Sequence, residues 1–325
     1  MELGSNMPPY GWSSVGREFG RKSKIIVILG PTSSGKSELA IKIAQKYNGE
    51  IISADSRQVY REMNIGTGKI TKAEQKLVKH HMLDIVSPKF TFNAAQFKKK
   101  AEKIIEDILR RNKLPIICGG TGFWIKAIVD NVNFPEVKPN NNLRKRLEKE
   151  TAEKLFVMLK KLDPVRAKNI DAKNKVRLIR AIEICKTIGK VPIITTNETK
   201  HNFLQIGIAI PKEKLQSNIQ KRLKKRFRQG MIGEVEKLHK DHNLSWKKIQ
   251  SFGLGYYWIP LYLQKKINKE EMFEKVYLAE KDYAKRQMTW FSAQDRSTSG
   301  GQKDKRIKWV KNAKEAQVLV KKIFK

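Results

Sequence analysis

The segment Gly30-Pro-Thr-Ser-Ser-Gly-Lys-Ser37 constrains the fold more than any other part of the chain. It fits the pattern G-x-x-x-x-G-K-[ST] of a phosphate-binding loop. The β-branched run Ile25–Leu29 before it predicts a short buried strand, and apolar residues at helical spacing follow over 37–47. A strand, a glycine-containing turn and a helix in this order are typical of an α/β fold with a parallel sheet.

The phosphate-binding loop predicts a diphosphate site with roles for particular side chains. Backbone N–H groups of such a loop surround phosphate oxygens, and the helix N-terminus adds a favourable dipole. Lys36 is expected to reach the terminal phosphates, and the Ser37 hydroxyl can ligate Mg²⁺. The predicted diphosphate-binding residues are Gly30, Pro31, Thr32, Ser33, Ser34, Gly35, Lys36 and Ser37.

The rest of the chain continues the α/β pattern around a basic helical segment. Apolar runs predict strands at 51–53, 114–118 and 203–210, and helical spacing recurs at 94–111, 122–130, 212–241, 269–291 and about 312–323. We expect a P-loop NTPase-like core, with a parallel sheet flanked by helices, from 23–133 and 202–325. Residues 134–201, rich in Lys and Arg, predict an inserted all-helical subdomain.

Residues 1–22 contain Pro, Gly and Ser and predict a flexible leader without the apolar core of a secretory signal. A weak organelle-targeting leader stays open as an alternative, because acidic residues are few there. The chain has no apolar run near the roughly 20 residues that cross a bilayer, so no membrane span is expected.

Charge is the strongest global signal. The 325 residues include 68 Lys and Arg against 32 Asp and Glu, a net charge of +36. Such an excess attracts polyanions, so nucleic acid is the favoured partner, with a lysine-biased proteome as the plain alternative. The two cysteines, Cys118 and Cys185, are expected to be reduced and buried, and Cys and His lack the spacing of a zinc site.

The loop does not name the reaction. Most proteins with this loop use nucleoside triphosphates and place an Asp at a second strand end to hold Mg²⁺. Here the strand 114–118 runs into Gly119-Gly120-Thr121-Gly122, and the acidic residue nearest a strand end is Asp55. This departure weakens the ordinary NTPase interpretation.

Six stretches in this order make the sequence resemble the tRNA dimethylallyltransferase family. They are GPTSSGKS at 30–37, ISADSRQVYREMNIGTGK at 52–69, HHMLDI at 80–85, LPIICGGTGFWIKA at 114–127, RLIRAIE at 177–183 and YAKRQMTWF at 283–291. The resemblance implies transfer of a dimethylallyl group from dimethylallyl diphosphate to N6 of the adenosine next to the anticodon. It also implies tRNA, through its anticodon arm, as partner, and we expect a cytoplasmic monomer.

The resemblance and the strand-end position together assign the catalytic residues. Asp55 is expected to be the general base for the N6 proton, because a strand-end carboxylate beside the loop faces the ligand crevice. The alternative is a cap or a magnesium-shell carboxylate. Thr121 is expected to contact diphosphate or acceptor, and a helix N-cap is its alternative role.

The resemblance further implies a set of tRNA-contacting residues. The set consists of Asp55, Ser56, Arg57, Gln58, Thr121, Arg144, Arg177, Arg180, Lys285, Arg286 and Gln287. Solvated surface charge is the plain alternative for the arginines. Trp290-Phe291 are expected to be packing anchors, and His80-His81 structural or tRNA-facing. Val176, Tyr257-Trp258 and Ser292 depart from the family pattern and concern tRNA recognition more than catalysis.

Three alternatives remain at this point. A small P-loop kinase would consume ATP, but the missing second acidic residue argues against it. An isopentenyltransferase acting on free adenine nucleotides would not need the basic excess or the helical insertion. A non-catalytic RNA-binding module would not need Lys36, Ser37, Asp55 and Thr121 together.

Overall fold

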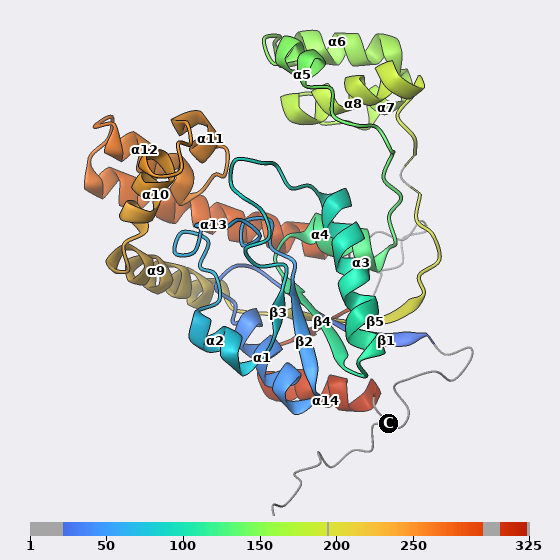
Figure 1. Ribbon diagram of the computed structural model, residues 1–325, viewed down its shortest axis with the longest axis vertical. Helices are drawn as coiled ribbons and strands as arrows, with labels where there is room; N and C mark the ends of the chain where they lie inside the picture. Colours follow the sequence, from blue (N-terminus) through green and yellow to red (C-terminus); the bar gives the residue numbers. More distant parts are fainter. Residues whose placement is uncertain (1–21, 194, 295–305, 324–325) are drawn as a thin grey trace, which may run out of the picture. The chain divides into compact units, whose positions relative to one another are not determined.

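The computed structural model describes residues 22–193, 195–294 and 306–323 (Figure 1). The expected leader, 1–22, lies outside these residues except for Lys22. The chain divides into two compact units, one from Met1–Asp130 with Glu198–Lys325 and the other from Asn131–Asn197. Each unit has a hydrophobic core of its own.

A parallel sheet of six strands, in the order β3-β2-β4-β1-β5-β6, forms the centre of the first unit. The strands are β1 Ser23–Leu29, β2 Gly49–Ser53, β3 His80–His81, β4 Leu114–Gly119, β5 His201–Ile208 and β6 Ile307–Val310. Leu29 at the end of β1 pairs with Gly119 of β4 and Gly207 of β5. Because the strands are parallel, their carboxyl ends share one edge of the sheet, where ligands of open α/β folds bind.

Helices cover both faces of this sheet. Alternate strand residues such as Ile26 and Ile28 form one core cluster with Leu39 of α1 (Lys36–Lys46) and Val320 of α14 (Ala313–Ile323). On the other side lie α3 (Ala94–Arg110) and α4 (Gly122–Val129). These two helices pack through the stacked rings of Phe97 and Trp124, whose centroids are 4.4 Å apart. The predicted α/β class, with a parallel sheet flanked by helices, is confirmed.

A group of helices completes the first unit. They are α2 Lys72–Leu77, α9 Lys212–Arg228, α10 Met231–Lys240, α11 Trp246–Gln250, α12 Gly255–Leu263 and α13 Lys269–Gln294. The single helix expected at 212–241 is split at Gly230, whose φ of 95° is left-handed and suits glycine.

The short strands β3 and β6 were not predicted, because runs of two and four residues carry too little periodicity.

Among the described residues of the second unit, all regular secondary structure is helical apart from an isolated bridge between Val132 and Thr196. Its helices are α5 Asn141–Leu147, α6 Ala152–Leu162, α7 Pro164–Lys168 and α8 Lys175–Ile188. Each begins at a polar N-cap residue whose side chain accepts a backbone N–H, as Asn174 does from Arg177 in α8. Leu155, Leu159 and Leu178 are fully buried and form the centre of its core.

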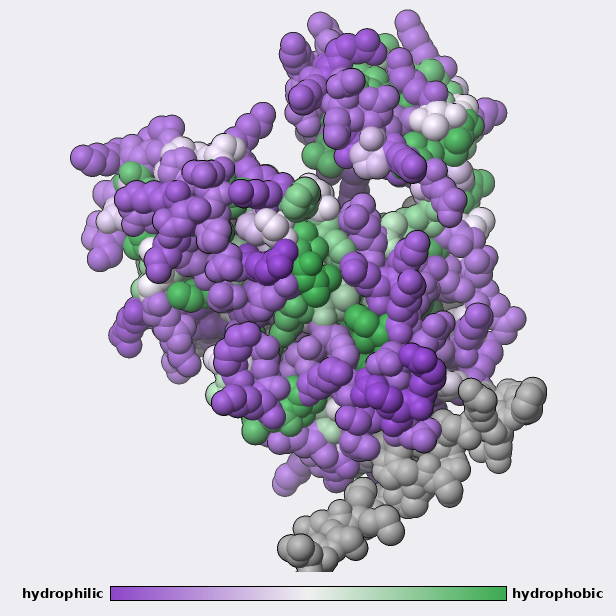
Figure 2. All heavy atoms as spheres, viewed as in Figure 1, coloured by the Kyte–Doolittle hydropathy of each residue, from purple (hydrophilic) through white to green (hydrophobic). Residues whose placement is uncertain are grey.

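The surface is strongly polar. Figure 2 shows hydrophilic residues over most of the visible face, with smaller apolar areas between them. No helix among the residues that the structure describes is both long enough and apolar enough to span a membrane.

Candidate active site

The phosphate-binding loop joins the end of β1 to the start of α1, as its sequence predicts. Gly35, the N-cap residue of α1, has a left-handed φ of 88°, and Ser33 has a φ of 62°. A hydrogen bond from Lys36 Nζ to the Pro31 carbonyl, 3.1 Å long, joins the two ends of the loop. The loop therefore lies at the carboxyl edge of the sheet, at the N-terminus of a helix.

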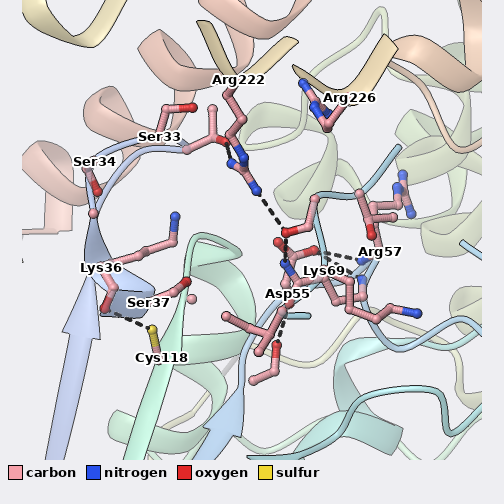
Figure 3. A pocket seen from close by; sticks show the side chains of 18 of the residues that line it. Ser33, Ser34, Lys36, Ser37, Asp55, Arg57, Lys69, Cys118, Arg222 and Arg226 are labelled. Atoms are coloured by element: carbon pink, nitrogen blue, oxygen red, sulfur yellow. Dashed lines mark hydrogen bonds between the residues drawn. The ribbon is translucent and has the colours of Figure 1, made fainter. Parts of the chain in front are cut away.

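Several polar groups of the loop lack the partners that buried groups normally have. The hydroxyl oxygens of Ser33 and Ser34 are buried and have no hydrogen-bond partner within the described part of the chain. Burial lowers the pKa of Lys36 below its usual value, and the Lys36 side chain points into the pocket of Figure 3. Two orphaned hydroxyls and a buried ammonium fit an anionic ligand such as a diphosphate.

Asp55 lies two residues beyond the end of β2, in a tight turn. Its Oδ1 accepts the backbone N–H groups of Arg57 at 2.9 Å and Gln58 at 3.4 Å. The same turn is tied to the end of β4, because Thr121 Oγ1 accepts the backbone N–H of Ser56 at 3.0 Å. Thr121 stands at the N-cap position of α4, but its hydroxyl binds this turn instead of a helix N–H.

Gln287 of α13 connects the two loops of the site. Its Oε1 accepts the backbone N–H of Thr32 at 2.7 Å, and its Nε2 donates to the Gly120 carbonyl at 2.9 Å. The contact is so close that a Cβ on Gly120 would lie 2.1 Å from Nε2 of Gln287. Gln287 is buried and holds both loops, so the structure gives it an internal bracing role, and the tRNA contact expected from the sequence stays a prediction.

Two arginines of α9, Arg222 and Arg226, lie near the phosphate-binding loop, and no sequence motif singled them out. Arg222 donates through Nη1 to Thr32 Oγ1 at 3.0 Å and through Nη2 to the Gly68 carbonyl at 2.8 Å. Arg226 is buried, forms an ion pair with Glu280 and donates to the Gly66 carbonyl at 2.8 Å. Figure 3 shows Arg222 and Lys36 directed into the same space from different elements.

The arginines differ in charge environment as well as in partners. Burial lowers the pKa of Arg222, and the nearby Arg226 lowers it further. A guanidinium nevertheless stays protonated in proteins, so Arg222 brings a partly buried positive charge to the site. The usable sequence signal is their position on α9, where Arg226 shares the buried side with Ile219 and Leu223.

These groups surround one cavity of about 2300 Å³ within the first unit. Its wall includes Thr32, Ser33, Ser34, Gly35, Lys36, Ser37, Asp55, Ser56, Arg57, Gln58, Arg286 and Gln287 from the sequence-based set. Gly30, Pro31, Thr121 and Lys285 of that set do not belong to the wall. Gly30 and Pro31, the first two residues of the loop, are buried, and Lys285 is exposed on α13.

The three arginines of the helical unit that were expected to contact RNA have different surroundings. Arg144 and Arg180 both form ion pairs with Glu183, whose side chain is 0% exposed. The bond from Arg144 Nη2 to Glu183 Oε2 measures 2.7 Å, and Asn140 N–H also donates to Glu183 Oε1 at 2.6 Å. Arg177 is exposed. Two of the arginines expected to contact RNA are therefore committed in part to the core of their own unit.

The remaining expectations concern His and Cys. His81 binds Glu50, with 2.7 Å between Nε2 and Oε2, and Glu50 also pairs with Arg111 and Lys113. This gives His81 a structural place on β3.

Both cysteines are free and buried, and burial raises the pKa of the Cys118 thiol to about 11. Phe291 is fully buried and Trp290 packs edge-on against Phe123, as expected for packing anchors.

Comparison with known proteins agrees with this geometry. The model of the IPP transferase family matches residues 58–294. The tRNA dimethylallyltransferase of Acetivibrio thermocellus is 43% identical over 277 residues, which cover 82% of this chain and 88% of that protein. The enzyme of the same name from Caldicellulosiruptor saccharolyticus is 39% identical over 285 residues, covering 84% and 91%.

Solved structures agree as well. The full-length tRNA isopentenylpyrophosphate transferase of Bacillus halodurans superposes with a TM-score of 0.67 at 31% identity, covering 93% of this chain and 96% of that one. A eukaryotic dimethylallyltransferase acting on tRNA gives a TM-score of 0.69 at 27% identity, covering 83% and 70%. The chain belongs to the IPP transferase family, and the resemblance stated from its motifs is confirmed.

Proposed function

We propose that this protein transfers a dimethylallyl group from dimethylallyl diphosphate to N6 of the adenosine adjacent to the anticodon in tRNA. The observation that carries the proposal is the meeting of a phosphate-binding loop and the strand-end carboxylate Asp55 in one cavity. The relatives bear the name of this activity. In the reaction, N6 bonds to C1 of the dimethylallyl group, and the C1–O bond breaks with its electron pair leaving on diphosphate.

The donor's diphosphate fits the loop side of the cavity. The Ser33 and Ser34 hydroxyls supply donors without protein partners among the described residues, and Lys36 supplies a buried positive charge. Arg222 approaches from α9 and is anchored on Thr32 of the same loop. Donors that are already fixed stabilise the charge that develops on the leaving group without reorganising during the reaction.

Asp55 is the proposed acceptor of the N6 proton. Its Oδ1 already accepts two backbone N–H groups, which fix the orientation of the carboxylate. Thr121 supports the turn through its bond to the Ser56 N–H and acts as a positioning residue in this proposal. The adenine must leave its stack in the RNA to reach this cavity, as nucleobases do in other enzymes that modify them.

Magnesium is the proposed cofactor. Mg²⁺ in phosphate sites uses one or two protein oxygens together with phosphate oxygens and waters, so it does not need a cluster of carboxylates. The Ser37 hydroxyl, which is on the cavity wall, would hold the ion together with diphosphate oxygens and waters. When bound, the ion would neutralise charge on the diphosphate.

The tRNA is the proposed partner of the polar rim and of the helical unit. Ser56, Arg57, Gln58 and Arg286 line the cavity and are proposed to contact the modified adenosine and its neighbours. Lys285 and Arg177 are exposed cations suited to phosphate contacts. Arg144 and Arg180 are proposed to contact RNA through the guanidinium N–H groups that do not bind Glu183. A cytoplasmic monomer remains the expected state.

One assay tests the proposal. The full-length protein is incubated with labelled dimethylallyl diphosphate, Mg²⁺ and unmodified tRNA, with AMP as a competing acceptor. We expect label in tRNA, lost in Asp55→Ala while tRNA affinity stays nearly unchanged. Label in AMP alone would indicate the nucleotide enzyme, and label in neither acceptor would refute the proposal. A large loss of tRNA affinity in Asp55→Ala would show that Asp55 mainly binds RNA.

A further inference from the structure

The side-chain carboxylate of Glu234, in α10, binds the backbone N–H groups of one segment of the cavity wall. The segment, residues 64–69, is named the strap here, and all six of its residues line the cavity. Oε2 of Glu234 accepts the N–H groups of Asn64 at 2.7 Å and Ile65 at 2.6 Å. Oε1 accepts the N–H of Gly66 at 2.9 Å and the hydroxyl of Tyr256 at 2.7 Å.

This arrangement uses the carboxylate as the anion in a backbone nest. Three successive N–H groups that converge on one point form a concave site for negative charge. Bonds to an ionised acceptor are stronger than those between neutral groups, so Glu234 fixes the strap firmly. The Tyr256 hydroxyl is the fourth donor to this carboxylate. Burial raises the pKa of Tyr256 well above its usual value, so the hydroxyl keeps the proton that it donates. A Cβ on Gly66 would lie 2.6 Å from the Tyr256 ring.

The strap connects the two ends of the site. The Gly68 carbonyl accepts from Arg222 Nη2 at 2.8 Å and from Gln58 Nε2 at 3.4 Å. Arg222 also holds Thr32 of the phosphate-binding loop, and the Gln58 backbone N–H donates to Asp55 Oδ1. One carbonyl oxygen thus lies between the diphosphate side and the proton-accepting side. Any shift of the strap changes the spacing between the two.

We propose that Glu234 is a positioning residue for the transfer reaction, setting through the strap the placement of Arg222 relative to Asp55. The inference rests on the proposed function, since it assigns Arg222 to the diphosphate and Asp55 to the N6 proton. Glu234 itself is not part of the cavity wall. It acts on the chemistry only through the strap backbone.

Other contacts hold the strap folded when this one is removed, which makes the effect separable from folding. Lys69 binds Asp84 at 2.5 Å and the Tyr60 carbonyl at 2.8 Å. Arg226, paired with Glu280, binds the Gly66 carbonyl. Loss of Glu234 therefore loosens the strap locally instead of releasing it.

The test compares Glu234→Gln with two other variants of the full chain. The amide keeps the size of the side chain but turns an NH₂ group toward backbone N–H donors, so at least one oxygen contact becomes a repulsive one. Tyr256→Phe removes a single bond and leaves the three N–H contacts in place. Glu236→Gln is the matched control on the same helix, where the exposed pair with Lys240 at 2.7 Å has no contact with the strap.

For Glu234→Gln we expect a fall in kcat and a rise in the KM for dimethylallyl diphosphate, each on the order of tenfold. The Kd for tRNA should change less than about twofold, because exposed lysines and arginines provide most RNA affinity. Tyr256→Phe should give a smaller change in the same direction, and Glu236→Gln none.

Unchanged kcat and KM in a folded Glu234→Gln protein, checked by circular dichroism and tRNA binding, would overturn the inference. So would a lowered melting temperature as the only change. Absence of transfer by the unaltered protein would instead count against the proposed function, so the two failures are distinguishable.

Discussion

Gln287 Oε1 lies 2.7 Å from the backbone nitrogen of Thr32, although 255 positions separate the two residues in the sequence. The other end of the same amide holds the Gly120 carbonyl at 2.9 Å. A single buried side chain thus fixes the phosphate-binding loop against the turn that carries Thr121. This brace explains why the C-terminal motif belongs to the site.

Gln287→Leu tests the brace. Leucine fills similar space but leaves the Thr32 N–H and the Gly120 carbonyl unpaired, which costs about 1–3 kcal/mol for each buried group. We expect a lower melting temperature and a KM for dimethylallyl diphosphate raised about tenfold. Thr289→Leu, at an exposed position of the same helix, should change neither. A Gln287→Leu protein with unaltered KM would mean that the loop keeps its shape without the brace.

Arg222→Lys tests the phosphate-side cation. A lysine keeps the charge but cannot hold Thr32 Oγ1 and the Gly68 carbonyl at once in the fixed fork of a guanidinium. We expect the KM for the isoprenoid donor to rise on the order of tenfold, with tRNA affinity nearly unchanged. Arg228→Lys, an exposed residue of the same helix, is the control. Equal kinetic constants in the two variants would remove Arg222 from the proposed diphosphate site.

The arginines of the helical unit should separate into two behaviours. Arg177 is exposed, so Arg177→Ala should weaken tRNA binding and lower the slope of log K against log salt by about one. Arg144→Ala should in addition destabilise the protein by about 1–3 kcal/mol, because it removes a partner of the buried Glu183. Binding measured from low to high salt, together with thermal melting, checks both. An unchanged slope for Arg177→Ala would refute a phosphate contact.

Acid should weaken the helical unit through Glu183. Burial alone would raise the pKa of this carboxyl, but hydrogen bonds from Arg144, Asn140 and Arg180 lower it to about 2 from a usual 4.5. The folded pKa is the lower one, so the stabilisation is complete above about pH 4.5 and is lost as pH falls toward 2. Denaturant melts at pH 6 and pH 3 should differ less in Glu183→Gln than in the unaltered protein. An equal difference in both would place the acid sensitivity elsewhere.

Much of the core could be predicted because its signals are local. The run Ile25–Leu29 is β-branched and fully buried, and the glycines beside it mark the phosphate-binding loop. His80–His81 forms a strand only because it pairs with β2, and no two-residue pattern carries that information.

Site residues that belong to a sequence motif could be predicted. Residues that differ from many similar ones only in their tertiary contacts could not. Arg222 is one of several basic residues on α9, and only its bonds to Thr32 and Gly68 distinguish it. Glu234 is likewise one of two glutamates on α10, and the other pairs with Lys240 at the surface. Gln287 was grouped with the site from its motif and lies on the cavity wall, but its bracing contacts depend on a fold that brings distant segments together.

The span between Thr32 and Gln287 also has a consequence for how the protein is made. A ribosome adding about 5–20 residues each second needs roughly ten to fifty seconds to pass from one to the other. Throughout that interval the nascent chain carries a phosphate-binding loop without its brace. Truncated translation products that end before α13 would therefore lack both bonds of Gln287, and their phosphate-binding loop would bind the isoprenoid donor more weakly than the loop of the longer chain.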